Sequence, residues 1–203
     1  MNHILTNQKI ISAEFKKRRN SLIKHELGHW LTARHLGFPV GGITLRIDFA
    51  LLPRSQKPVF GHHGTAHIDP TPIFNDLGDV EAYLIDRLTV LYAGVAAQIM
   101  DIDDPSSDLT TELLNTDGAS DLRVIQELMP IMQGIRSPCL TDRETRAADA
   151  QPIMQDAWDK ARDLIEELRP KFERIIPKLE MRYTAYNKIL EISPEELAAF
   201  ESE

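Results

Sequence analysis

The chain has 203 residues, of which 42% are hydrophobic and 27% charged, a composition typical of a globular protein with a real core. Its formal net charge of −8 argues against broad binding to nucleic acid, because an acidic surface repels the phosphate backbone. The single cysteine excludes an internal disulfide and a cysteine-rich zinc knuckle.

The first twenty residues lack the charged and then apolar pattern of a signal peptide. The longest apolar run, residues 88–100, is shorter than the roughly 18 residues that span a bilayer. We therefore expect a cytoplasmic protein with no membrane span and no nucleic-acid partner. The basic cluster at residues 16–20 is interpreted as a solvated helix face.

Residues 12–36 are predicted to form the first helix, with Ser12 as its N-cap and Gly37 as its stop. A break near Asn20 and Ser21 is left open. The pattern of this helix decides the functional prediction, because it carries two histidines on one face.

Two strand-like runs, 43–51 and 58–68, flank a proline-containing turn, which predicts a hairpin or a small sheet. Residues 79–100 predict a helix that is apolar nearly all round and therefore buried. The polar residues after it predict a loop with one short turn at most. The next helix is predicted to start near Ser120, where apolar residues resume helical spacing.

Residues 134–145 are predicted to be a connector, and the last sixty residues to be mostly amphipathic helix. Pro170 and Pro177 predict an interruption of this helix into two or three segments. Its apolar stripe, which includes Trp158, suits either a core or an interface between copies, so a homo-oligomer stays open. The run SPEELAAF at 193–200 predicts a capping box at the start of the last helix.

The run HELGH places His25, Glu26 and His29 on the first helix. Residues four apart lie about 40° apart around a helix and about 6 Å along it, so both imidazoles aim at one point and can ligate zinc. Glu26 lies beside them, near enough to hold a metal-bound water. Gly28 weakens the helix by about 1 kcal/mol relative to Ala unless close packing requires it. The pattern predicts a metal site.

The third ligand must come from elsewhere. On a continuous helix His35 lies roughly 100° off the ligand face, so we predict that it does not bind the metal. Glu81 and Glu112 are candidates by position. Asp121 is the better candidate, because it faces the core at a helix start, where a buried carboxylate needs a partner.

Four segments resemble, in order, the zinc peptidase domain of the FtsH-type ATP-dependent proteases. HELGHWLTARHLG resembles that family's HEAGH helix, LLPRSQKPVFG its IPRG…LG strand region, LTVLYAGVAAQIM its LLGGRAAEE helix, and NTDGASDL its TTGASNDL segment. The resemblance covers residues 21 to about 133. In that family the aspartate of the last segment is the third zinc ligand, which implies Asp121. Because the segment is one residue shorter here, Asp117 is the alternative.

The family's two acidic residues in its AAEE run are replaced by Gln98 and Ile99, and no phosphate-cradling GxxxxGK[ST] motif is present. The resemblance therefore implies a free-standing, ATP-independent peptidase domain. The expected fold is α+β: a mostly α-helical, zincin-like domain with a small β-hairpin or sheet after the HExxH helix and a C-terminal helical bundle. We expect one domain over 1–203, with a metal-site core at 1–133 and amphipathic helices at 141–203.

The sequence thus predicts a zinc-dependent endopeptidase that cleaves unfolded or flexible polypeptides. His25, His29 and Asp121 would hold Zn2+, and Glu26 would be the general base toward a zinc-activated water. Two alternatives remain: a zinc-binding, non-catalytic regulatory or adaptor protein on a peptidase scaffold, and a repressor-clipping peptidase of the ImmA kind. Cleavage specificity and the existence of a separate ATPase partner stay open.

The second strand-like run contains GHHGTAH, with His62, His63 and His67. A solvated strand end is the preferred interpretation, and a second metal site is the alternative. The family comparison implies that this strand is the edge of the active-site sheet, where an extended peptide could add by backbone hydrogen bonding.

Overall fold

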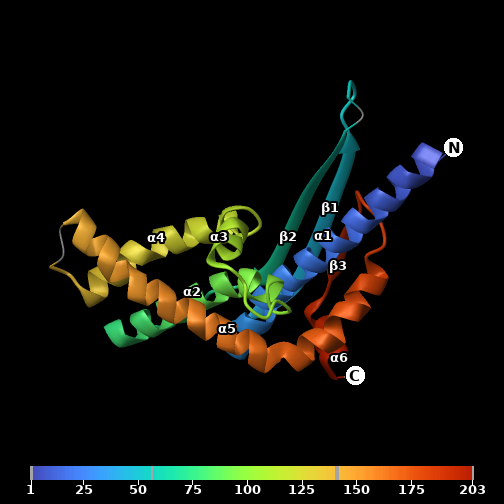
Figure 1. The fold of residues 1–203 in the computed structure, drawn as a ribbon. Helices are drawn as coiled ribbons and strands as arrows, with labels where there is room; N and C mark the ends of the chain where they lie inside the picture. Colours follow the sequence, from blue (N-terminus) through green and yellow to red (C-terminus); the bar gives the residue numbers. More distant parts are fainter. Residues whose placement is uncertain (1, 56, 140–141, 203) are drawn as a thin grey trace.

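A computed structural model describes residues 2–55, 57–139 and 142–202, with side chains from residue 12 onwards except at residue 143. This part of the chain has an α+β fold of six helices and one three-stranded sheet (Figure 1). The elements, in chain order, are α1 (Asn2–His35), β1 (Val40–Leu51), β2 (Pro58–Ile68), α2 (Leu77–Gln98), α3 (Ser107–Asn115), α4 (Ala119–Arg136), α5 (Arg143–Arg182), β3 (Ile189–Ile192) and α6 (Pro194–Ser202).

α1 is one continuous helix, so the predicted N-cap at Ser12 is wrong, and the helix does not break near Asn20 and Ser21, a point that the sequence left open. Between the start of α1 and the HELGH run the chain has neither glycine nor proline. Glu14 and Arg18 form an ion pair one turn apart at 2.5 Å, which supports helix in this segment. The polar residues that suggested a break therefore lie on a helix that has no local reason to stop.

Two glycines explain how α1 ends and how it packs. Gly37 has a φ of 84°, a conformation that favours glycine, and the Phe38 N–H donates to the Ala33 carbonyl at 2.9 Å, which closes the helix end. Gly28 lies against α2: a Cβ there would come within 2.5 Å of the Ala93 carbonyl oxygen. The helix propensity lost at Gly28 thus allows the close approach of α1 and α2.

The sheet is antiparallel in the order β2-β1-β3. β1 and β2 form the long hairpin that projects from the body in Figure 1 and confirm the two predicted strand-like runs, with Leu45 opposite Gly64. β3 was not predicted. It is four residues long and pairs with β1 so that Ile43 faces Ile192. Because β1 lies between its two partners, β2 keeps one edge without a strand neighbour.

α2 confirms the predicted buried helix, and Asp76 caps it by accepting from the Asp79 N–H. The loop predicted after it is wrong in part, because α3 occupies nine of these residues and is capped by the Ser106 side chain. α3 has no buried residue. No helix in the described part of the chain is long and apolar enough to cross a membrane.

α4 begins at Ala119, close to the predicted start at Ser120, and continues through Pro130 to Arg136. The connector predicted at 134–145 is therefore shorter, and its residues 140–141 lie outside the described residues. α5 follows as a single helix that contains three prolines.

The predicted interruption of α5 at Pro170 and Pro177 is wrong, since both lie inside one helix. Each proline removes one backbone hydrogen bond, but buried residues before and after each proline hold the helix in place. These residues are at most 2% exposed: Leu168, Phe172, Ile175 and Leu179. The helix accommodates the prolines by changing direction in its C-terminal half (Figure 1). Packing thus outweighs the local preference to break.

The end of α5 is tied to α1 and to the sheet. Arg19 donates to the Tyr183 carbonyl at 3.1 Å and pairs with Glu180 at 3.0 Å, so the basic cluster at 16–20 is not wholly a solvated face. The Tyr183 hydroxyl accepts from the backbone N–H of Ile47 and donates to the Lys188 carbonyl. The capping box of α6 is confirmed: the Ser193 N–H donates to Glu196 Oε2 at 3.0 Å and the Glu196 N–H donates to Ser193 Oγ at 3.2 Å.

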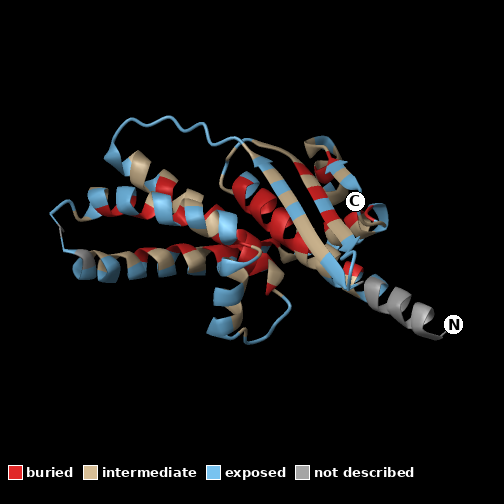
Figure 2. Cartoon of the chain, turned by 90° about the horizontal axis from the view of Figure 1, so that it is seen from above, coloured by how far each residue is buried: buried red, intermediate tan, exposed pale blue. Residues whose placement is uncertain are grey.

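The core lies between α1, α2, α5 and the inner face of the sheet, where Figure 2 shows most of the buried residues. The apolar stripe of α5 belongs to this core: Ile153 and Leu168 are both 2% exposed, and Trp158 packs edge-to-face on Tyr92 at 5.7 Å. One cluster of buried side chains therefore runs from α1 to α6. The stripe is a core feature and needs no second copy to cover it.

Candidate metal centre

The two histidines of the HELGH run lie one turn apart on the buried face of α1. His25 is 5% and His29 7% exposed, and their Nε2 atoms are 3.0 Å apart. The two rings are nearly perpendicular, at 85°. The helix therefore directs both imidazoles at one point, as the spacing predicts.

Asp121 joins this point from the first turn of α4. Its Oδ2 lies 3.2 Å from His25 Nε2 and 3.3 Å from His29 Nε2. The three side chains form the one group in the described part of the chain whose ligand atoms could hold a metal ion, all within 4.8 Å of one another. The alternative, Asp117, lies outside this group.

Hydrogen bonds on the far side of each ring fix the tautomers. His29 Nδ1 lies 2.7 Å from the Val90 carbonyl oxygen, and His25 Nδ1 lies 3.0 Å from Gln98 Oε1. Both partners are acceptors, so each Nδ1 must carry the proton and donate it. In the neutral rings both Nε2 lone pairs then face each other and the Asp121 carboxylate. Three acceptors at 3.0–3.3 Å without a donor between them need a cation, either a shared proton or a metal ion.

The electrostatics of the group agree with this. Burial lowers the pKa of His29, but Asp121, Glu26 and the Val90 carbonyl together outweigh burial and raise it to about 9. Burial likewise raises the pKa of Asp121, and the two histidines more than reverse the effect, so the Asp121 pKa is held far below its usual range. The site therefore favours a positive charge at its centre, and a metal ion that binds there displaces a proton.

Glu26 is 6% exposed and lies between α1 and β2. Burial raises its pKa, while the charges of His29 and His25 and a backbone hydrogen bond from Ala66 partly oppose that rise. Gly64 makes room for it, because a Cβ at Gly64 would overlap the Glu26 carboxylate. Glu26 is thus a carboxyl group beside the triad with a raised proton affinity, which suits a group that accepts and returns a proton.

A second layer of polar contacts holds His25. Gln98 Nε2 donates to Asp117 Oδ2 at 2.6 Å and to Ser21 Oγ at 2.7 Å, which leaves its Oε1 to accept from His25. His62 Nε2 lies 3.4 Å from the other oxygen of Asp117. From the sequence, Gln98 stands out only as the loss of an acidic residue, and Asp117 only as an alternative ligand.

Gly94 on α2 is a further residue of the site, and it was not predicted. A Cβ at Gly94 would lie 2.5 Å from His29 Nε2 and 2.7 Å from His25 Cε1, so this glycine leaves the space in which the rings meet. A glycine inside an otherwise apolar helix was the available signal, because it costs helix stability unless close packing requires it.

The other candidate residues lie elsewhere. His35 Nδ1 is 3.9 Å from a Glu167 oxygen and does not approach the triad, as predicted. Glu81 pairs with Arg136 at 2.6 Å. Glu112 borders the cavity but is not among the converging groups.

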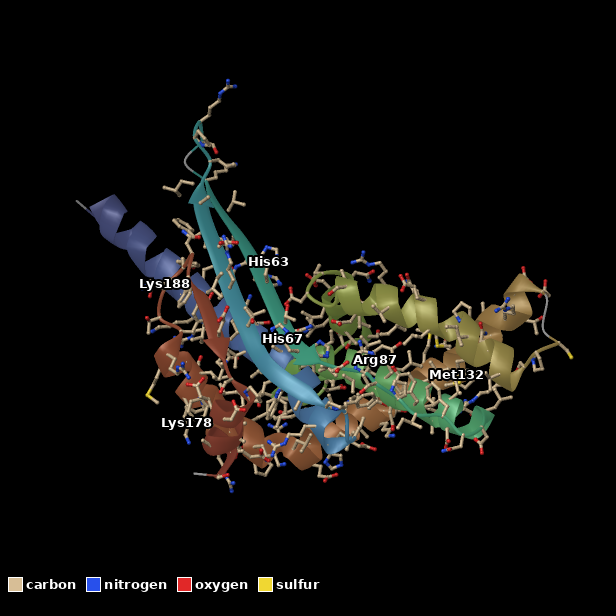
Figure 3. The ribbon with its side chains drawn as sticks, turned by 180° about the vertical axis from the view of Figure 1, so that it is seen from behind. His63, His67, Arg87, Met132, Lys178 and Lys188 are labelled. Carbon is tan, nitrogen blue, oxygen red and sulfur yellow. The ribbon has the colours of Figure 1, made fainter. Side chains whose placement is uncertain are left out.

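The histidines of β2 do not form a second centre. His63 and His67 lie along β2 in Figure 3, and His67 Nε2 is 3.0 Å from the Thr44 hydroxyl. Within residues 12–139 and 142–202, leaving out the side chains that are not described, only the His25 triad qualifies as a metal-binding group. The preferred interpretation of these histidines as part of an exposed strand fits this arrangement.

The triad and Glu26 open into one cavity of about 680 Å3. Residues of α1, β2, α2 and the start of α4 line this cavity. Residues at its borders include Arg18, His62, Ile68, Arg87 and Glu112. A substrate in this cavity would therefore lie against the strand and beside the metal-binding group.

No model of a known protein family matches the chain, and no curated protein matches it either.

Proposed function

We propose that the protein is a metal-dependent peptidase with zinc as its metal. The observation that carries this proposal is the convergence of two Nε2 lone pairs and one carboxylate oxygen at 3.0–3.3 Å, with Glu26 in the same cavity. Two imidazoles and one carboxylate are a ligand set that suits zinc at a catalytic centre. The resemblance of the four segments to FtsH-type peptidase domains supports the same conclusion.

The metal ligands and Glu26 have different roles in the proposed reaction. His25, His29 and Asp121 would hold the ion, which when bound supplies Lewis-acid polarisation of the scissile carbonyl and lowers the pKa of water. Glu26 takes a proton from the attacking water as the water oxygen adds to the carbonyl carbon. It then gives that proton to the amide nitrogen as the C–N bond breaks. The raised pKa of Glu26 suits both steps.

The substrate that fits this cavity is an extended polypeptide. β2 is an edge strand, and Glu26 accepts a hydrogen bond from the Ala66 backbone, so this side of the β2 backbone faces the cavity. Backbone groups point alternately to the two sides of a strand, so Gly64 and His62 present theirs to the same side. A peptide added along that edge would pass Glu26 with its backbone held by hydrogen bonds, whereas a folded domain would not fit.

Glu26→Gln tests the mechanism. The variant removes the proton acceptor and preserves the shape of the side chain, so cleavage of casein, an unfolded substrate, should fall at least about a hundredfold. Zinc content by elemental analysis should stay near that of the wild type, because Glu26 is not among the three converging ligands. Glu112→Gln is the matched control, since Glu112 borders the same cavity outside the site.

A Glu26→Gln protein as active as the wild type would remove Glu26 from the mechanism. Stoichiometric zinc with no cleavage by the wild type would instead favour the non-catalytic regulatory or adaptor function.

A further inference from the structure

Arg87 is a cationic side chain of the cavity that the mechanism does not use. It is half-buried on α2 and borders the cavity that holds the triad. Figure 3 labels it between the lower end of β2 and α4. Among the residues whose side chains the structure describes, Arg87 has no ion pair or hydrogen bond. A half-buried guanidinium that faces a cavity without a partner is available to a ligand.

Two charged residues that could compete with Arg87 or neutralise it are already paired. Asp86, its neighbour in sequence, pairs with Lys160 at 2.6 Å, and the other arginine of the cavity, Arg18, pairs with Glu14 at 2.5 Å. Lys17 also borders the cavity but is exposed to solvent, where water satisfies its charge. Arg87 is therefore the cavity cation that gains most from an anionic ligand.

The position of Arg87 relative to Glu26 follows from the elements. Arg87 precedes Val90 by almost one helical turn, roughly 5 Å along α2, and the Val90 carbonyl accepts from His29. Arg18 lies over the Phe60 ring near the start of β2, whereas Glu26 lies at Gly64 and Ala66. α1 and β2 thus run in the same direction along the cavity. α2 runs opposite to α1, because Gln98 meets His25 and Val90 meets His29, so Arg87 lies beyond His29 toward the later residues of β2. One helical turn covers about the same length as two strand residues at about 3.3 Å each. We therefore place Arg87 within about two residues of the cleaved bond.

We propose that Arg87 forms a carboxylate-binding subsite that selects polypeptides with a negative charge within about two residues of the cleaved bond. This proposal rests on the proposed peptidase function, because only a peptidase defines a cleaved bond, but binding of the carboxylate by Arg87 does not require turnover. The planar guanidinium can donate two parallel hydrogen bonds to one carboxylate, which gives geometric selection as well as charge attraction.

The carboxylate has two sources, and they imply different directions for the peptide. An acidic side chain can reach Arg87 from a peptide that runs either way along β2. A free C-terminal carboxylate can reach it only if the residues on the Arg87 side follow the cleaved bond, which requires a peptide parallel to β2.

The experiment measures binding in the Glu26→Gln background, where turnover is suppressed. The probe is a short fluorescein-labelled peptide of Ala, Val and Thr with one Glu, moved in turn through the central positions, and its Gln counterpart. Each is made with a free and with an amidated C-terminus. We expect one Glu position, or the free C-terminus, to bind about tenfold tighter than its neutral counterpart by fluorescence anisotropy.

Adding Arg87→Gln should abolish this preference, and Arg87→Lys should keep part of it, because the charge remains without the planar fork. Arg123→Gln is the matched control: Arg123 is an exposed arginine on α4 outside the cavity, and its loss changes the net charge equally. Circular dichroism melting checks that each variant folds.

Equal binding of the charged and neutral peptides, no binding of any peptide, or a preference that survives Arg87→Gln would each overturn the subsite. The preference can be present when no peptide is cleaved, in which case the subsite stands and the peptidase function fails. If cleavage depends on Glu26 but no peptide with a carboxylate is preferred, the peptidase function stands and the subsite fails.

Discussion

At the scale of single residues, the space for the metal-binding group depends on glycine. Gly94 on α2 lies against both imidazole rings, and Gly64 on β2 lies against Glu26. Neither residue carries a functional group, yet a single methyl at either position would occupy the volume that a ring or a carboxylate fills. The positions of the imidazole rings and of the Glu26 carboxylate thus depend on the absence of a side chain at two positions on the elements that face α1.

Gly94→Ala should abolish stoichiometric zinc binding while the helices remain folded. The new Cβ would lie 2.5 Å from His29 Nε2, too close for the ring to keep its position. Gly134→Ala is the matched control, since a Cβ there meets nothing within 4 Å and Gly134 is exposed on α4. The control should raise the free energy of unfolding by about 0.5–1 kcal/mol. Elemental analysis and circular dichroism measure both outcomes, and full zinc binding by Gly94→Ala would contradict the geometry.

At the scale of elements, the sheet depends on the end of α5. β3 pairs with β1 only from Ile43 to Arg46, and the next β1 position, Ile47, donates its N–H to the Tyr183 hydroxyl instead. The hydroxyl donates in turn to Lys188, just before β3. One tyrosine side chain therefore extends the pairing of a four-residue strand and joins α5 to the sheet that carries β2.

Tyr183→Phe should destabilise the protein by about 1–3 kcal/mol, because the buried Ile47 N–H would lose its acceptor. Tyr83→Phe is the control: among the described residues the Tyr83 hydroxyl has no hydrogen-bond partner, so its removal should change stability by less than about 0.5 kcal/mol. Urea unfolding measures both variants. Equal stability of Tyr183→Phe and the wild type would show that the strand pairing does not need this hydroxyl.

At the scale of the whole molecule, Asp101 connects segments that are distant in the sequence. It follows α2 and pairs with Lys24 on α1 at 2.6 Å and with Arg169 on α5 at 3.0 Å. These two cations lower the pKa of Asp101 below its ordinary value, and Lys24 has the larger effect. A depressed pKa means that the folded state favours the charged form, so Asp101 stabilises the fold when it is ionised.

Asp101→Asn should therefore reduce stability at neutral pH and have little effect in acid. The contribution of Asp101 is present above the ordinary aspartate pKa of about 3.9 and is lost as the pH falls through the depressed folded-state value. Thermal melting of both proteins from neutral pH to below pH 3, in the presence of a chelator so that metal binding does not contribute, measures this. A difference in Tm that is constant across the pH range would show that Asp101 acts through packing and not through its charge.

Local patterns account for the parts of the fold that the sequence predicted well. Three features depend only on residues that are close together in the sequence, so the sequence alone predicts them. These features are the spacing of His25 and His29, the strand-like runs and the capping box at Ser193. Competition between local preference and packing explains the errors. Pro170 disfavours helix locally, but the buried residues around it hold α5 together.

The sequence by itself determined that two imidazoles and a glutamate share the buried face of one helix, because helical periodicity is a local property. Only the tertiary structure decided that Asp121 and not Asp117 meets them, that Gln98 and Val90 orient the rings, and that β3 completes the sheet. These contacts join residues that are 61 to 149 positions apart, as from His29 to Val90 or from Ile43 to Ile192. Such pairs depend on how helices and strands pack together, which no short stretch of sequence specifies.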